Sequence, residues 1–117
     1  MRYLLIVRVP ENGMPEGGPS PELIARMDRL ITEERKAGVL LDTGGLRPIE
    51  EASRVRLSHG RVTTTDGPFS EAKEVVGGFA MVEVPDRKAA EEAARRFLAV
   101  HGNDWEVEIE VRLIEGP

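Results

Sequence analysis

The chain of 117 residues contains no cysteine. Disulfide bonds, thiolate nucleophiles and cysteine-based zinc sites are therefore excluded as sources of stability or chemistry. A chain without cysteine suits a reducing compartment, and we expect a cytoplasmic location. The length is typical of one domain, so we expect residues 1–117 to form a single domain.

Aromatic residues are also scarce, with three Phe, one Tyr and one Trp. Because 40% of the residues are hydrophobic, a core can form, but aliphatic side chains must build most of it. Apolar runs are short, and none approaches the roughly 20 residues that a membrane-spanning helix needs. The first such run, residues 2–9, is soon followed by proline and charge, which predicts a strand rather than a signal peptide.

Charge of one sign does not dominate, although the balance is acidic. Charged residues make up 32% of the chain and the formal net charge is −5. Basic residues are interspersed with glutamate, so no long basic stretch is available for a phosphate backbone or an anionic lipid surface. We therefore expect neither nucleic acid nor a membrane as a partner.

Two amphipathic helices are predicted from apolar spacing and from their ends. The first begins after Ser20, a good N-cap followed by proline, and ends at Gly38. The second begins after the N-cap Asp86 and ends before Gly102. Strands are predicted at 2–9, 39–46, 78–85 and 106–114, and a hairpin at 53–65 turns at His59-Gly60.

This order of elements indicates an α+β fold of the ferredoxin-like type, an antiparallel sheet with two helices on one face. Strands 2–9 and 78–85 carry apolar residues on both faces, yet two helices cover only one face. Another copy of the chain is the simplest cover for the second face. We therefore expect a homodimer whose sheets face each other as a dimeric α+β barrel.

The stretch TDGPFSEAKEVVGGFAMVEV at residues 65–84 resembles the signature of the DGPF proteins in the YCII-related family. MRYLLIV at the start, LLDTGGLRP in the middle and IEVRLI near the end are also similar to that family. The resemblance implies a ferredoxin-like fold and a dimeric α+β barrel. It also implies largely unassigned biochemistry: relatives in the wider superfamily act on small, often aromatic molecules, and some DGPF proteins are linked with extracytoplasmic-function sigma factors.

One feature of the wider family is absent. The branch with enzymatic features has a histidine early in the first helix, paired with an aspartate. The first helix here, within SPELIARMDRLITEERKAG, contains no histidine. A His-Asp catalytic pair of that kind is therefore not expected in this protein.

The DGPF motif itself has two interpretations. Asp, Gly and Pro are ordinary turn residues, and Phe69 could fasten the loop to the core. Alternatively, Asp66 is a carboxylate at the mouth of a cleft, acting as a general base or ligand acceptor. We expect a small organic molecule to bind near this loop, with cofactor-free acid-base catalysis by Asp66 as one outcome. A non-catalytic accessory or sensor module with a regulatory protein partner is the alternative.

Other polar residues near the motif and on the last strand complete the candidate site. Ser70 to Glu74 predict a short helical turn, in which Lys73 could reach a ligand. Arg112, in a polar row with three glutamates, could receive an anion, and Phe69 could contact the ligand. His101 is interpreted as a cation-compatible residue at the end of the second helix. No spacing typical of a metal or phosphate-binding site occurs, so no cofactor is expected.

Overall fold

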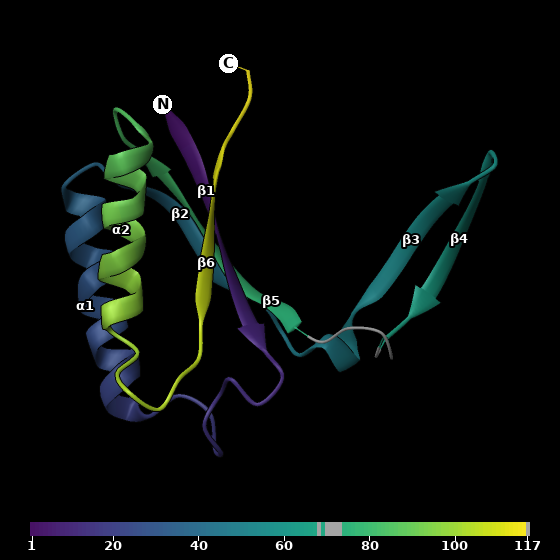
Figure 1. Ribbon diagram of the computed structural model, residues 1–117, viewed down its shortest axis with the longest axis horizontal. Helices are drawn as coiled ribbons and strands as arrows, with labels where there is room; N and C mark the ends of the chain where they lie inside the picture. The colour runs from purple at the N-terminus through teal and green to yellow at the C-terminus, as the bar shows by residue number, and fades with distance from the viewer. Residues whose placement is uncertain (68, 70–73, 117) are drawn as a thin grey trace.

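The computed structural model describes residues 1–67, 69 and 74–116. Its main sheet has four strands in the order β2-β5-β1-β6, and every neighbouring pair is antiparallel. Two helices pack on one face of this sheet, and a separate two-stranded hairpin stands away from it (Figure 1). In chain order the elements are β1 (Arg2–Pro10), α1 (Pro21–Lys36), β2 (Leu40–Gly45), η1 (Ile49–Glu51), β3 (Ser53–Ser58), β4 (Arg61–Asp66), β5 (Glu74–Glu83), α2 (Arg87–Ala99) and β6 (Glu108–Leu113).

Setting aside β3 and β4, the order is β-α-β-β-α-β with the two strands of each crossover separated by an antiparallel neighbour. This is the ferredoxin-like α+β arrangement, and the prediction of fold class is confirmed. The hairpin β3–β4 is an insertion between the second and third strands of that core. Its two turn residues, His59 and Gly60, both have positive φ, at 52° and 77°, as a two-residue hairpin turn requires.

The helices begin where the sequence predicts. Ser20 Oγ accepts a hydrogen bond from the backbone N–H of Leu23 at 3.1 Å, and Asp86 Oδ1 accepts one from Ala89 at 2.8 Å. Each cap satisfies a donor that the first turn of a helix leaves unpaired. Gly38 follows α1 with φ of 75°, a left-handed conformation that glycine adopts without strain.

The core lies between the helices and the sheet and is mostly aliphatic, as the composition predicts. Leu5 of β1 and Val82 of β5 are its fully buried large side chains. A stripe of three alanines on α2 lets the helix approach the sheet closely, and Phe97 fills the space beside it. The buried residues of this core are Tyr3, Leu5, Leu40, Ala80, Val82, Val84, Ala90, Ala93, Ala94 and Phe97.

An ion pair joins the two helices above the core. Glu34 of α1 is only 6% exposed, and both of its carboxylate oxygens accept hydrogen bonds from the guanidinium of Arg96 on α2. A buried carboxylate without a partner would destabilise the folded state. Because Glu34 needs the guanidinium of Arg96, this bidentate contact fixes how the two helices pack against each other.

The opposite face of the sheet carries a second apolar surface. Tyr3 and Leu5 point toward the helices, so the alternation of β1 directs Leu4 and Ile6 to the other side. Leu4 pairs with Met81, and Ile6 pairs with Phe79, across the β1–β5 ladder. All four side chains are partly exposed. We call these four residues, Leu4, Ile6, Phe79 and Met81, the open-face patch.

The start of strand β5 differs from the sequence prediction. Strand β5 begins at Glu74, whereas the sequence predicts a strand from residue 78, so the predicted helical turn is wrong at Glu74. The rest of that turn, residues 70–73, lies outside the described residues. Gly77 and Gly78 therefore lie inside β5, beside a register shift between Val7 and Arg8. A β-carbon on Gly78 would lie 2.8 Å from the carbonyl oxygen of Gly44, so the close approach of β2 to β5 requires glycine.

The last strand, β6, is shorter than predicted, beginning at Glu108 and ending at Leu113. In the segment before it, the backbone N–H of Glu106 instead donates a hydrogen bond to the carbonyl of Gly13. Among the described residues, neither helix is both long and apolar enough to cross a membrane.

Candidate functional site

The DGPF motif holds the base of the hairpin. The backbone N–H of Gly67 donates a 2.7 Å hydrogen bond to the carbonyl of Ala52. A β-carbon on Gly67 would lie 2.5 Å from the carbonyl oxygen of Ile49, so this backbone approach leaves no room for a side chain. Phe69 is 9% exposed, and the guanidinium of Arg54 lies 3.7 Å from the centre of its ring. Two chain segments are thereby joined where the hairpin leaves the body.

The predicted site residues do not converge on one cavity. Asp66 is the last residue of β4 and is exposed, whereas Phe69 is buried beneath Arg54. Arg112 lies on β6, in the main sheet. Lys73, like Pro68, lies outside the described residues. The roles assigned to Asp66, Phe69, Lys73 and Arg112 therefore stay predictions, and the arrangement of the three described residues among them does not by itself form a site.

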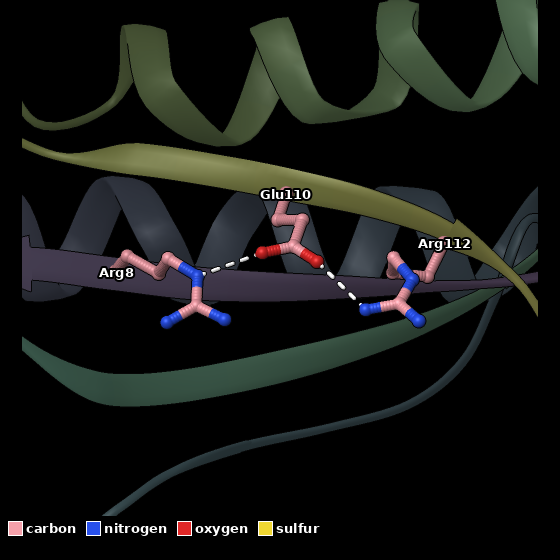
Figure 2. Close-up of polar contacts among 3 residues, drawn as sticks. All are labelled: Arg8, Glu110 and Arg112. Carbon is pink, nitrogen blue, oxygen red and sulfur yellow. Dashed lines mark hydrogen bonds and ion pairs between the residues drawn. The ribbon is translucent and has the colours of Figure 1, made fainter.

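A short charged row crosses the edge of the open face. Glu110 accepts a 2.9 Å hydrogen bond from Arg112 and a 2.8 Å hydrogen bond from Arg8 of the neighbouring strand (Figure 2). Hydrogen bonds from Arg112, which has the larger effect, and from Arg8 hold the pKa of Glu110 below its usual value of 4.5. Arg112 pairs with Leu4 in register, which places this row beside the open-face patch.

The contribution of this charged row to the free energy of unfolding should depend on pH. A carboxylate whose pKa is lower in the folded state stabilises the fold above its unfolded pKa, and the benefit disappears as pH falls through the folded value. We expect Glu110→Gln to lower the urea midpoint of unfolding slightly near neutral pH and not at all in strong acid. Urea titrations across pH, with Glu115→Gln as a charge-matched exposed control, would measure this. An equal effect at both pH extremes would contradict the assignment.

A cavity with a mainly apolar lining lies at one end of the sheet. It has a volume of about 810 Å³ and is bounded by the ends of β1 and β5, by the 46–52 segment and by the 101–107 segment. A second cavity of about 390 Å³ lies between the helices and the sheet. Val7, Gly77 and His101 line both. We call the larger one the end cavity; its lining includes Val7, Val9, Leu23, Leu46, Ile49, Val76, His101, Trp105 and Val107.

His101 is the titratable group shared by these two cavities. Its Nδ1 lies 3.0 Å from the carbonyl oxygen of Phe97, and a carbonyl can only accept, so Nδ1 carries the proton. In the neutral ring Nε2 is then an acceptor, and no hydrogen bond to it from a described residue is found. The indole of Trp105 meets the imidazole edge to face, with ring centres 5.3 Å apart. The ring is therefore fixed in tautomer and orientation.

This cavity was not predicted from the sequence. His101 does follow the C-terminus of α2, as interpreted, but its position as a lining residue depends on the return of the chain toward β6. One available signal was the spacing of His101 and the single Trp, at position 105, in a short connection broken by Gly102. The described residues contain no group of three side chains that could together ligate a metal ion.

The fold defines this protein as a ferredoxin-like α+β protein with an inserted hairpin. Within that class, the model of the YCII-related domain matches residues 1–109, and the chain belongs to that family. No curated protein matches the chain. Among solved structures, CutA from Xylella fastidiosa matches with a TM-score of 0.44 and 13% identity, covering 99% of this chain and 86% of that one.

Proposed function

We propose that this YCII-related protein is a cytoplasmic homodimer that binds a small organic molecule in the end cavity. The observation that carries the proposal is an apolar cavity of about 810 Å³ that contains an oriented histidine. Ligand sites are typically concave, mainly apolar and furnished with a few placed polar groups. The aromatic edge of Trp105 and the aliphatic lining favour an apolar or aromatic ligand with one polar group.

The chemistry available in this cavity is proton transfer by His101. With Nδ1–H donated to Phe97, Nε2 can accept a hydrogen bond or a proton from a ligand hydroxyl. Histidine is the side chain that most often performs general acid-base catalysis at neutral pH. Catalysis, if the ligand is a substrate, is therefore cofactor-free acid-base chemistry in which His101 takes the role that the sequence analysis gave to Asp66.

A non-catalytic sensor or accessory module is the second candidate. The same cavity would then bind an effector without turnover, and a regulatory protein, such as the extracytoplasmic-function sigma factor implied by the family resemblance, would respond. The observation that favours it is the projecting β3–β4 hairpin, whose apolar side chains are exposed and suited to a protein contact.

The role of His101 in ligand binding can be tested by substitution, with the same substitution at His59 as the control. We expect small phenols or aromatic carboxylic acids to raise the melting temperature of the wild type. His101→Asn keeps a donor for the Phe97 carbonyl but loses the imidazole, and should weaken binding about tenfold, the value of roughly one hydrogen bond. His59→Asn, in the exposed hairpin turn, should bind as the wild type does, because asparagine also tolerates positive φ.

Turnover separates the two candidate functions. An enzyme should consume a bound ligand, and its turnover rate should fall strongly in His101→Asn. A sensor should bind the same ligand and leave it unchanged. If binding by His101→Asn equals that of the wild type, or if the panel shifts neither protein, the end cavity is not the site.

A further inference from the structure

A polar cavity lies at the other end of β1 from the end cavity. It has a volume of about 800 Å³ and is formed where the start of α2 meets the start of β1 and the end of β6 (Figure 1). None of its lining residues lines the end cavity or the cavity between the helices and the sheet. We call it the α2 pocket; its lining includes Tyr3, Arg87, Lys88, Glu91, Val111 and Leu113.

The hydroxyl of Tyr3 is a free donor in this pocket. Tyr3 is only 4% exposed, and none of the described residues forms a hydrogen bond with its hydroxyl. The described residues also contain no enclosed side-chain N or O atom that lacks a hydrogen-bond partner. The hydroxyl therefore reaches the open space of the α2 pocket, which the side chain lines. A tyrosine buried this deeply usually hydrogen-bonds through its hydroxyl, and here a ligand would supply the partner.

The basic side chains of the pocket differ in whether they are already paired. Arg87 forms an ion pair with Glu91 at 3.4 Å, and Arg112 donates a 2.9 Å hydrogen bond to Glu110. Lys88 forms no ion pair with a described residue. It therefore brings a positive charge and three N–H donors to the pocket, on a flexible stem that can follow a ligand.

The two carboxylates in the lining are both engaged within α2. Asp86 caps the helix by accepting a 2.8 Å hydrogen bond from the N–H of Ala89, and Glu91 is paired with Arg87. The pocket lies at the N-terminal end of this 13-residue helix, where the aligned peptide dipoles give a partial positive charge. Three basic and two acidic residues line it, a formal balance of +1 in a chain whose net charge is −5. The local charge therefore favours an anion.

An apolar surface lies beside these donors. Leu113 pairs with Tyr3 and Val111 pairs with Leu5 across the β1–β6 ladder, so both side chains lie on the helix side of the edge strand. Leu113 is nevertheless 54% exposed. A ligand with a short hydrocarbon part would cover Leu113 while its charged end meets Lys88 and the hydroxyl of Tyr3.

From these groups we infer that the α2 pocket binds a small amphiphilic anion. Its carboxylate or phosphate accepts hydrogen bonds from the hydroxyl of Tyr3 and the ammonium of Lys88, and its hydrocarbon part packs on Leu113. Hydrogen bonds with a charged partner are stronger than those between neutral groups, so two of them can hold a small ligand. The site is separate from the end cavity and does not depend on whether the end cavity binds a ligand.

A nuclear magnetic resonance titration of the ¹⁵N-labelled protein tests this inference. The probes are hexanoate and hexyl phosphate, with hexanol as the neutral control. We expect at least one anion to shift the backbone amides of Arg87, Lys88 and Leu113 to saturation, and hexanol to leave them unchanged. Saturation by only one anion identifies whether the site prefers a carboxylate or a phosphate. Equal shifts with hexanol, or shifts confined to His101 and Trp105 in the end cavity, would overturn the inference, as would no shift at all.

Two conservative variants identify the donors. Tyr3→Phe removes only a hydroxyl that no described residue uses, so its urea midpoint should equal that of the wild type while affinity for the bound anion falls about tenfold. Lys88→Gln should weaken binding by a similar factor, whereas Lys36→Gln, at the end of α1, should not change it. Unchanged affinity in Tyr3→Phe or Lys88→Gln would overturn the proposed contacts. A lower urea midpoint for Tyr3→Phe would show that the hydroxyl serves the fold instead.

Discussion

Gly67→Ala is expected to destabilise the protein by about 1–3 kcal/mol, which is the usual cost of forcing extra atoms into a packed site. The new methyl carbon would meet the carbonyl oxygens of Ile49 at 2.5 Å and Ala52 at 3.1 Å. Both neighbours are backbone atoms, so neither can rotate away as the tip of a side chain would. The backbone at the base of the β3–β4 hairpin must shift, which strains the Gly67–Ala52 hydrogen bond.

The matched control is Gly45→Ala, at the end of β2. A β-carbon there has no other atom within 4 Å, and its φ is not positive. Alanine at such a position restricts the unfolded chain and should leave stability unchanged or raise it by up to about 1 kcal/mol. Urea unfolding followed by the fluorescence of the single tryptophan would compare the two variants. Equal stabilities would show that the DGPF glycine is not held by close backbone packing.

Arg96→Ala is expected to have an effect of comparable size, about 2–3 kcal/mol, for an electrostatic reason. The substitution leaves the carboxylate of Glu34, whose side chain is 7% exposed, without its guanidinium partner. Water that would solvate this carboxylate is largely excluded by the two helices. Removing one partner of a buried charge pair costs more than the pair itself contributes, because the remaining charge stays desolvated.

Arg95 provides the comparison within the same helix. Its ion pair with Glu92 is exposed, at 65% and 55% of the two side chains, so Arg95→Ala should change stability by less than about 0.5 kcal/mol. The double variant Glu34→Leu with Arg96→Leu should recover most of the stability lost in Arg96→Ala, because it also removes the carboxylate that the single variant leaves buried without a partner. Equal effects of Arg95→Ala and Arg96→Ala in thermal unfolding would contradict this account.

Local chemistry explains what the sequence predicted well. Ser20 and Asp86 cap their helices because a short polar side chain can reach a nearby free N–H, a contact within one turn. His59-Gly60 turns the hairpin because both residues accept positive φ. Alternation in β1 likewise predicted that Leu4 and Ile6 lie on the face opposite Tyr3 and Leu5, since side-chain direction in a strand depends only on neighbouring residues.

Long-range contacts explain what the sequence did not predict. Glu74 and Val75 belong to β5 because they pair with Pro10 and Val9, more than sixty positions earlier, although the glycines after them interrupt the strand pattern. The end cavity is formed by segments distant in sequence, and His101 becomes one of its lining residues only when they meet. The DGPF motif was interpreted partly as chemistry; the structure shows its glycine as a point of backbone contact.

The hydrogen bond between Gly67 and Ala52 has a consequence for how this chain can vary. It brings the two ends of the β3–β4 hairpin together, so the hairpin occupies the position of a loop whose length does not affect the strands on either side. Lengthening such a loop costs little free energy. Residues 53–66 therefore form an insertion whose sequence and length can vary without a change in the strand order of the main sheet.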